Sequence, residues 1–428
     1  MSAAPHRPTA CVASSGSEIL QGLYADTNAQ RLSQLLLADG FLVQGHRAMP
    51  DDRAVLVAGL GEALRTHDLV VLTGGLGPTE DDLTRFAAEE LYAAPLVFHE
   101  DAAEAIARRF RERGVPMPES NLVQARLPEG ARVVPNANGT APGFFMPPRA
   151  GLGAMLALPG PPREWPPMYA DARTIDFVNH FPGRPRTHTH TIHIAFVPES
   201  RVNQLGADLF AARPDVDVTI LAALGQIRLR LTGWAESEAA AEEAALAHAA
   251  AFRGRLEPDT IFGEGPPEWT LGEAVVRIAK ERGWKVATAE SVTGGLVAAR
   301  LTDHGGASAA FAGAVVAYSF DVKSRQLGVD AAELAAHGAA NAETAAAMAR
   351  GARERLGADW AVSTTGVAGP DADTHGAPVG TVWFGLAGPS GDHAPVRRRQ
   401  LGGRGLVREW AANQALEILR RAMLGLPG

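Results

Sequence analysis

The run Asp68–Gly75, "DLVVLTGG", constrains the fold of this 428-residue chain more than any other segment. Its apolar residues follow one another without a polar interruption, and the run ends in two glycines. This pattern is typical of a strand that is buried on both faces in a parallel sheet covered by helices. Loops that follow the carboxyl ends of such strands bind ligands in open α/β sheets. We therefore expect an α/β fold with a site after this strand.

Alternating apolar runs and amphipathic segments divide the sequence into three predicted domains. Residues 9–175 are expected to form one α/β domain and residues 268–428 a second. Residues 178–262 follow the order strand, helix, two strands, helix, which indicates a small α+β domain. This middle domain is KH-like but lacks the Gly-x-x-Gly loop that clamps a nucleic-acid backbone. The glycines and prolines at 263–267 predict a linker before the last domain.

The charge and cysteine content argue against several classes of protein. A net charge of −8 does not suit the broad basic surface that nucleic-acid binding needs. The single cysteine, Cys11, can form neither an internal disulfide nor a multi-thiolate metal site. Met1–Thr9 lacks the apolar run of a secretion signal, and no segment reaches the roughly 18 apolar residues of a membrane span. We expect a soluble, cytoplasmic protein that binds neither membranes nor nucleic acid.

Ser291 lies between a predicted strand, 284–290, and a glycine pair that precedes a predicted helix near 294–303. This arrangement points a hydroxyl into a cleft beside the free N–H groups of a helix start. Such N–H groups can hold the oxyanion that forms when a nucleophile attacks an amide carbonyl, and here they belong to residues near Thr293 and Gly294. The alternative is that Ser291 only caps the helix, because serine is a common N-cap.

Tyr318 and Lys323 come at the end of the next predicted strand, "GAVVAYS", 313–319. Neighbouring parallel strands bring their carboxyl ends together, so we expect both residues near Ser291. A lysine without an acidic partner can lose its proton when desolvated and then serves as a general base, although a solvated lysine is the alternative. The loop "STTGVAGPD", 363–371, adds hydroxyls and glycines suited to a phosphate or a ribose.

The loop "TGGLGPT" at 73–79 follows the buried strand predicted at 68–73. It offers small residues and unpaired N–H groups, as anion-binding loops require. Asp51 and Asp82 are carboxylates that could hold a divalent cation against a pyrophosphate. The alternative for Asp81 and Asp82 is that they are acids at the start of a helix, near 81–92, where they complement the helix dipole.

In these segments and their order, the chain resembles the CinA (competence/damage-inducible) family. The C-terminal residues that carry the resemblance are Ala289-Glu290-Ser291, Thr293-Gly294-Gly295, Tyr318, Lys323, Gly328-Val329, Gly366, Gly369-Pro370, Pro378–Val382, Arg404 and Arg408. The N-terminal ones are Gly16–Leu20, Gly22, Asp26–Ala29, Asp51, Thr73–Thr79, Asp81–Thr84, Gly139–Gly143 and Leu158–Gly160. With the middle domain, the two regions cover nearly the whole chain.

For the C-terminal domain the resemblance implies a nicotinamide mononucleotide deamidase that needs no cofactor and acts in pyridine nucleotide recycling. Ser291 would be the nucleophile and Lys323 its base, with Tyr318 relaying or orienting the proton. Arg404 and Arg408, with Thr365, would neutralise the nucleotide phosphate. The remaining residues expected to bind substrate are Thr293, Gly294, Gly295, Gly366 and Gly369. We expect small-molecule nucleotide substrates and a homodimer.

For the N-terminal domain the resemblance implies a molybdopterin-binding-like fold, associated with metal-dependent ADP-ribose pyrophosphatase activity. Related folds bind or adenylylate molybdopterin instead. The expected site residues are Glu18, Asn28, Asp51, Gly74, Gly75, Asp81 and Asp82, with Asp51 and Asp82 as metal ligands. Two alternatives stay open. Only this domain could be an active, phosphate-handling or molybdopterin-type enzyme, or the chain could be a non-catalytic binding protein related to competence.

Overall fold

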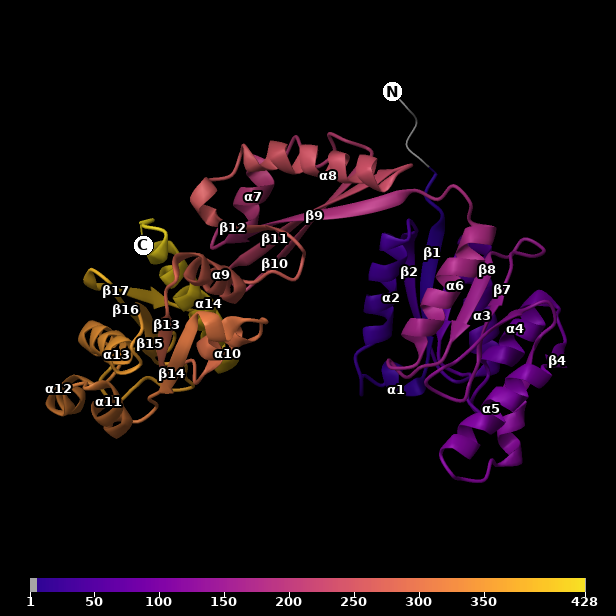
Figure 1. The fold of residues 1–428 in the computed structure, drawn as a ribbon, viewed down its shortest axis with the longest axis horizontal. Helices are drawn as coiled ribbons and strands as arrows, with labels where there is room; N and C mark the ends of the chain where they lie inside the picture. Colours follow the sequence, from indigo (N-terminus) through magenta and orange to yellow (C-terminus); the bar gives the residue numbers. More distant parts are fainter. Residues whose placement is uncertain (1–5, 428) are drawn as a thin grey trace. The chain divides into compact units, whose positions relative to one another are not determined.

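The computed structural model describes residues 6–427, so the first five residues of the segment Met1–Thr9 lie outside the described part. Contacts divide the chain into two compact units (Figure 1). The first unit comprises the chain up to His188 together with Gly233–Ala244, and the second comprises Thr189–Thr232 together with the chain from Ala245. The boundary crosses the predicted middle domain, and the division into three domains stays a prediction. None of the described helices is long and apolar enough to cross a bilayer.

The first unit is built on a six-stranded mixed sheet of order β2-β1-β3-β8-β7-β6. Its strands are β1 (Thr9–Ser15), β2 (Leu42–Met49), β3 (Leu69–Thr73), β6 (Arg132–Val134), β7 (Gly143–Met146) and β8 (Ala154–Leu158). The four strands from β2 to β8 are parallel, and β7 and β6 are antiparallel to their neighbours. The apolar run that was expected to be buried on both faces is β3, and all five of its residues are buried.

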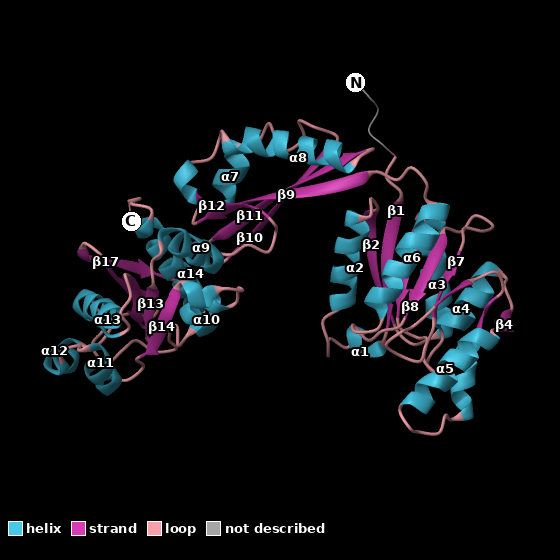
Figure 2. Cartoon of the chain, viewed as in Figure 1, coloured by secondary structure: helices cyan, strands magenta, loops and turns pink. Residues whose placement is uncertain are grey.

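Helices cover both faces of this sheet, as Figure 2 shows. Both faces of β1 are apolar and need cover, since Ala10 and Val12 pack on one side of the sheet and Cys11 and Ala13 on the other. The first cluster includes residues of α2 and α6, and the second includes residues of α3 and α4. The helices of the unit are α1 (Ser17–Leu20), α2 (Thr27–Ala38), α3 (Arg53–Thr66), α4 (Thr84–Tyr92), α5 (Glu100–Glu112) and α6 (Trp165–His180). A small hairpin pairs β4 (Leu96–Phe98) with β5 (Arg126–Pro128), and a 3-10 helix covers Glu119–Ala125.

A four-stranded sheet of order β10-β11-β9-β12 follows in the chain, and the unit boundary passes through β9, β11 and α8. Its elements are β9 (Arg186–Ala195), α7 (Glu199–Leu205), β10 (Val216–Ala223), β11 (Gln226–Ala235), α8 (Glu238–Arg253) and β12 (Ile261–Gly265). The expectation of a linker at 263–267 was wrong in part. Because Gly263, Glu264 and Gly265 pair with β9, the stretch begins as an edge strand, and only the residues after it connect to the next helix.

The second α/β sheet has five strands in the order β14-β13-β15-β16-β17, with β13 parallel to both of its neighbours. The strands are β13 (Val286–Glu290), β14 (Phe311–Val316), β15 (Trp360–Gly366), β16 (Thr381–Gly388) and β17 (Gly391–Arg399). The helices are α9 (Leu271–Arg282), α10 (Leu296–Thr302), α11 (Phe320–Leu327), α12 (Ala331–His337), α13 (Ala342–Arg355) and α14 (Arg404–Met423). Residues of α9, α10 and α14 pack on one face, and residues of α11, α12 and α13 on the other.

The helix α11 was not predicted, and it changes where Lys323 lies. The strand expected to run to Ser319 ends at Val316, and Lys323 follows on α11 instead of on a strand end. Ser319 caps the helix by accepting a hydrogen bond from the Val322 N–H, and Gly328, with φ of 69°, ends it in the left-handed region. These capping residues could have been read from the sequence, but an eight-residue helix carries too short a periodic pattern to be recognised by its apolar spacing.

Candidate active site

Ser291 follows directly after β13, at the start of a tight turn that leads into α10. Its N–H donates to the Thr364 carbonyl at 2.9 Å, which anchors the turn to the neighbouring strand β15. Gly294 and Gly295 have φ of 60° and 97°, a region that side chains disfavour, so the glycine pair permits the turn. The Ser291 side chain is nearly buried, and its hydroxyl lies in the wall of a cavity.

Lys323 brings its amine to the Ser291 hydroxyl from α11. The Lys323 Nζ donates to Ser291 Oγ at 2.9 Å, to the Ala317 carbonyl at 2.7 Å and to the Tyr318 carbonyl at 3.3 Å. The residue is only 1% exposed, and no ion pair within residues 6–427 includes it. Burial lowers the pKa of Lys323 from its ordinary value of 10.5 to about 8. A fraction of the amine is therefore neutral near pH 7 and can accept a proton.

Glu290, the residue before the serine, is a fully buried carboxylate that stabilises the turn by hydrogen bonds to it and to the start of α10. It accepts hydrogen bonds from the N–H groups of Gly295, Val297 and Ala298 at 2.9, 3.1 and 2.8 Å. The Thr293 hydroxyl also donates to it, at 2.8 Å. The negative charge thus lies against the amino end of α10, where the helix dipole favours it. Glu290 had been singled out only as part of the motif Ala289-Glu290-Ser291, with no role of its own.

The hydrogen bonds of the turn determine which N–H groups can face an oxyanion. The expected donors included Gly294, but its N–H donates to the Ser291 carbonyl at 3.1 Å, and that of Gly295 is taken by Glu290. Among the described residues, the N–H groups of Val292 and Thr293 have no acceptor in the protein. Of the two expected donors, Gly294 is therefore occupied and Thr293 keeps a free N–H, while Val292, which lines the cavity, has a second free N–H; the glycines shape the turn.

The cavity beside the serine has a volume of about 370 Å³. Six of the residues predicted for this site line it, namely Ser291, Tyr318, Lys323, Thr365, Gly366 and Arg404. The other predicted residues, Thr293, Gly294, Gly295, Gly369 and Arg408, lie outside its walls. Phe320 and a loop that carries Asp373 and His375 complete the walls, and neither had been singled out for this role. The aromatic rings of Tyr318 and Phe320 are both substantially exposed, at 60% and 42%.

Polar side chains at the cavity differ in how free they are to bind a ligand. Arg404 donates to the Gly369 carbonyl at 3.0 Å and to the Tyr318 hydroxyl at 2.6 Å, which leaves further N–H groups of an exposed guanidinium unused. The Thr365 hydroxyl donates to the Ala339 carbonyl at 2.7 Å, so its proton is not available to a phosphate. Arg408 donates to the Thr293 carbonyl at 3.0 Å and fixes that peptide group.

In the first unit, Gly74 and Gly75 also follow a buried strand and have φ of 101° and 65°. A Cβ atom on Gly74 would lie 2.3 Å from the Ser15 carbonyl oxygen, so the loop needs glycine there. The Asp82 carboxylate accepts from the Gly77 N–H at 2.7 Å, the Thr79 N–H at 2.8 Å and the Thr79 hydroxyl at 2.5 Å. Because Asp82 organises this loop, α4 begins only at Thr84 and not at Asp81 as expected.

The remaining residues predicted for the N-terminal site are either hydrogen-bonded to other residues of the first unit or exposed. Asp51 accepts from the Ser15 hydroxyl at 2.9 Å and from the Ser17 N–H at 3.0 Å. Asn28 donates to the Gly160 carbonyl at 2.7 Å and accepts from the Trp165 indole at 2.9 Å. Glu18 and Asp81 are exposed side chains.

A divalent cation between Asp51 and Asp82 does not fit this arrangement. Asp51 is already used by Ser15 at the end of β1 and by Ser17 at the start of α1, and Asp82 by donors of its own loop, so a metal would have to displace these donors. Over residues 6–427, no group of three or more histidine, cysteine or acidic side chains is placed to hold a metal. In this structure Asp51 ties the turn after β2 to the segment 15–17, and Asp82 braces its own loop.

Comparison with known proteins gives the wider context. The CinA C-terminal domain matches residues 268–423, and a family described as a probable molybdopterin binding domain matches residues 11–173. A relative from Symbiobacterium thermophilum, named for competence-damage induction, is 40% identical over 420 residues, which cover 96% of this chain and 97% of the relative. A CinA-like protein of Frankia casuarinae is 39% identical over 423 residues, covering 96% of this chain and 95% of its own.

These matches define an α/β chain that joins a molybdopterin-binding-like domain to a CinA C-terminal domain. The chain belongs to the CinA family. Among solved structures, the competence/damage inducible protein of Agrobacterium tumefaciens is 36% identical, with a TM-score of 0.34, and aligns with 36% of this chain and 93% of its own.

Proposed function

We propose that the C-terminal part of the chain hydrolyses the carboxamide of nicotinamide mononucleotide, with Ser291 as nucleophile and Lys323 as general base. The observation that carries this proposal is the 2.9 Å contact between Lys323 Nζ and Ser291 Oγ, made by a buried lysine that has no acidic partner in the described part of the chain. A serine hydroxyl is a poor nucleophile at neutral pH and needs a base within hydrogen-bond distance. The lowered pKa of Lys323 supplies one.

The first half of the reaction acylates the serine. The neutral Lys323 amine takes the proton from Ser291 Oγ as the oxygen bonds to the carboxamide carbon. The oxyanion that forms would accept a hydrogen bond from the N–H of Val292, which lines the cavity and has no acceptor within residues 6–427. The carbon–nitrogen bond then breaks, and Lys323 returns the proton to the leaving nitrogen, which departs as ammonia.

The second half releases the product. Water loses a proton to Lys323 and attacks the acyl carbon, the bond from that carbon to Ser291 Oγ breaks, and the serine regains its proton. The product is nicotinic acid mononucleotide. Tyr318 contributes its ring to the cavity wall, and its hydroxyl accepts from Arg404, so we assign it to substrate positioning. Arg404, exposed at the cavity, would bind the phosphate.

The test is ammonia release from nicotinamide mononucleotide by the purified full-length protein, with Ser291→Ala as the matched control. Ammonia should appear in equimolar amount with nicotinic acid mononucleotide, and the variant should release none above background. A non-catalytic binding role predicts no ammonia from either protein. If the variant released ammonia as fast as the wild type, the serine would have no part in the reaction.

A further inference from the structure

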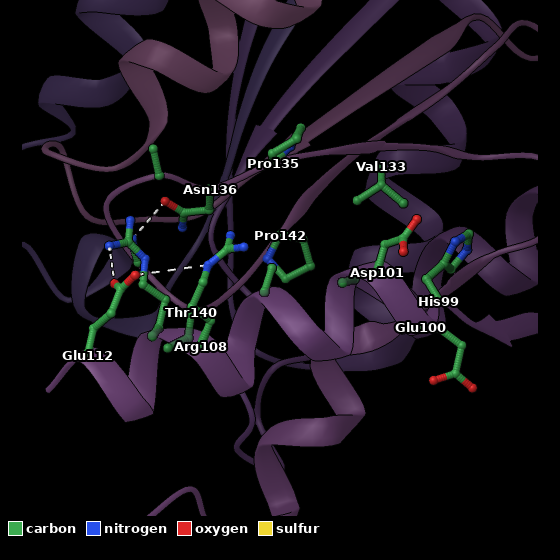
Figure 3. Close-up of a pocket in the computed structure, with 15 residues that line it drawn as sticks. His99, Glu100, Asp101, Arg108, Glu112, Val133, Pro135, Asn136, Thr140 and Pro142 are labelled. Carbon is green, nitrogen blue, oxygen red and sulfur yellow. Dashed lines mark hydrogen bonds and ion pairs between the residues drawn. The ribbon is translucent and has the colours of Figure 1, made fainter. Parts of the chain in front are cut away.

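A second cavity, of about 750 Å³, lies within the first unit between one face of α5 and the segment 133–142 (Figure 3). None of the residues predicted for the N-terminal site above lines it, although Gly139, Thr140 and Pro142 belong to the segment 139–143 that carries the family resemblance. Its volume falls in the range of small-molecule sites. Between its ends the walls are mostly small or apolar, formed by Ala102, Ala105, Val133, Pro135 and Pro142.

One end of this cavity carries an excess of positive charge. Arg108 and Arg109 both line it, and they share one carboxylate, that of Glu112. Both contacts are long, since Arg108 Nε lies 4.0 Å and Arg109 Nη1 lies 3.5 Å from the Glu112 oxygens. The Thr140 hydroxyl in the opposite wall has no hydrogen-bond partner within the described chain. Two incompletely neutralised guanidinium groups beside a free hydroxyl suit a phosphate.

The other end carries an excess of negative charge. Figure 3 shows His99 and Asp101 there, away from Arg108 and Glu112. The carboxylates of Glu100 and Asp101 make no ion pair within residues 6–427, and the His99 Nε2 atom is buried without a hydrogen-bond partner there. Asp101 and Arg109 are eight residues apart on one helix, which corresponds to about 12 Å. The two charged ends are therefore separated by roughly the length of a mononucleotide.

The order of charges along α5 also stabilises the helix itself, because acids precede and bases follow along its dipole. That effect does not require the charges to face a cavity, and it leaves the orphaned His99 nitrogen unexplained. A buried polar atom without a partner costs free energy unless something else satisfies it.

We propose that this cavity binds a dipolar mononucleotide, with its phosphate at Arg108, Arg109 and Thr140 and a cationic or amine-bearing ring at Asp101 and His99. The site is distinct from the Ser291 cavity and does not depend on the deamidase proposal. Nicotinamide mononucleotide, whose pyridinium ring is cationic, has this chemistry. Nicotinic acid mononucleotide carries a carboxylate in place of the carboxamide, and the acidic end would repel it.

The experiment counts nucleotide sites by calorimetric titration of the full-length protein carrying Ser291→Ala, which prevents turnover. Adding Arg108→Gln and Arg109→Gln should remove one site per chain for nicotinamide mononucleotide. The matched control is Arg111→Gln on the same helix, since Arg111 pairs with Glu104 and does not line the cavity. Thermal unfolding checks that the variants remain folded. An unchanged number of sites in the double variant would overturn the proposal.

The charge of the ring gives a second readout. The site removed by the double variant should bind nicotinic acid mononucleotide at least tenfold more weakly than nicotinamide mononucleotide, and Asp101→Asn should narrow that difference. Equal affinity for the two nucleotides would contradict the assignment of the acidic end. Arg404→Ala separates the two cavities, because it should weaken only the site beside Ser291. If Arg404→Ala and not the arginine pair abolished all binding, the second site would not exist.

Discussion

The loops that follow β13 and β3 have similar sequences and opposite chemistry. Both follow a buried strand, contain a glycine pair with positive φ, and carry polar side chains nearby. After β13, a buried amine faces a hydroxyl, and two N–H groups are left without acceptors. After β3, the Asp82 carboxylate accepts three hydrogen bonds from donors of its own loop. Reactivity depends on which groups a loop leaves unsatisfied, and in this respect the two loops differ.

The largest effects should come from the serine–lysine pair. Ser291→Ala and Lys323→Arg should each lower kcat by about a hundredfold or more, because arginine keeps the charge but cannot yield its proton. The double variant should be little worse than either single one, since the two residues act as a unit. Steady-state ammonia release measures all three, with the exposed Lys280→Arg as control. Retention of most activity by Lys323→Arg would rule out the lysine as base.

The next effect concerns the buried carboxylate behind the turn. Glu290→Gln replaces an oxygen acceptor with a donor that faces the N–H groups of α10. We expect the free energy of unfolding to fall by about 1–3 kcal/mol, the usual cost of unsatisfied buried groups, and kcat to fall by roughly tenfold through loss of the turn geometry. Denaturant unfolding and kcat at a temperature far below unfolding measure the two effects. As the control, the exposed Glu281→Gln should change neither the free energy of unfolding nor kcat. A wild-type kcat in Glu290→Gln would show that Glu290 does not position the turn for catalysis.

Variants of two arginines, Arg404 and Arg408, test which of them binds the substrate phosphate. Arg404→Ala should raise KM for the mononucleotide by about tenfold with a smaller change in kcat, because phosphate binding is similar in ground and transition states. Arg408→Ala should lower kcat instead, since Arg408 holds the Thr293 peptide and does not line the cavity. Initial-rate kinetics with both variants test this contrast. Equal turnover of nicotinamide riboside and the mononucleotide would exclude a phosphate role for Arg404.

The pH dependence follows from the lysine. Because the base acts when unprotonated and its pKa is about 8, kcat/KM should rise with pH and level off above that value. The expected rise is about tenfold between about pH 7 and about pH 9. The unfolded chain binds this proton up to its ordinary pKa of 10.5, so the same group adds stability as pH rises between the two values. A flat profile of kcat/KM over this range would contradict the assignment.

The smallest effect on deamidation should come from the other loop. Asp82→Ala should leave ammonia release unchanged, because the loop it organises belongs to the other compact unit. It should lower the stability of the first unit by about 1–3 kcal/mol by freeing the N–H groups of Gly77 and Thr79. The neighbouring exposed Asp81→Ala serves as control and should cost less. Loss of deamidation in a folded Asp82→Ala protein would show that the two loops are coupled.

Some of the fold and site was readable from local patterns. The unbroken apolar run predicted β3, and the motif order predicted the family and the pairing of Ser291 with Lys323. The error in the placement of Lys323 came from an eight-residue helix too short to show a period. The strand in 263–265 was read as a linker because glycine suggests a turn, while its pairing with β9 depends on residues about 70 positions earlier.

The sequence by itself determined the chemical groups and the order in which the chain presents them, because strand periods, glycine turns and motif spacings are local properties. Only the tertiary structure decided which of those groups are free. Packing buries Lys323 without an ion-pair partner within residues 6–427, which lowers its pKa and suits it to the proposed role of base, whereas Asp82 braces a turn because its own loop folds back onto it. Hydrogen-bond saturation and desolvation depend on the three-dimensional surroundings of a group, and these are not encoded within any short stretch of sequence.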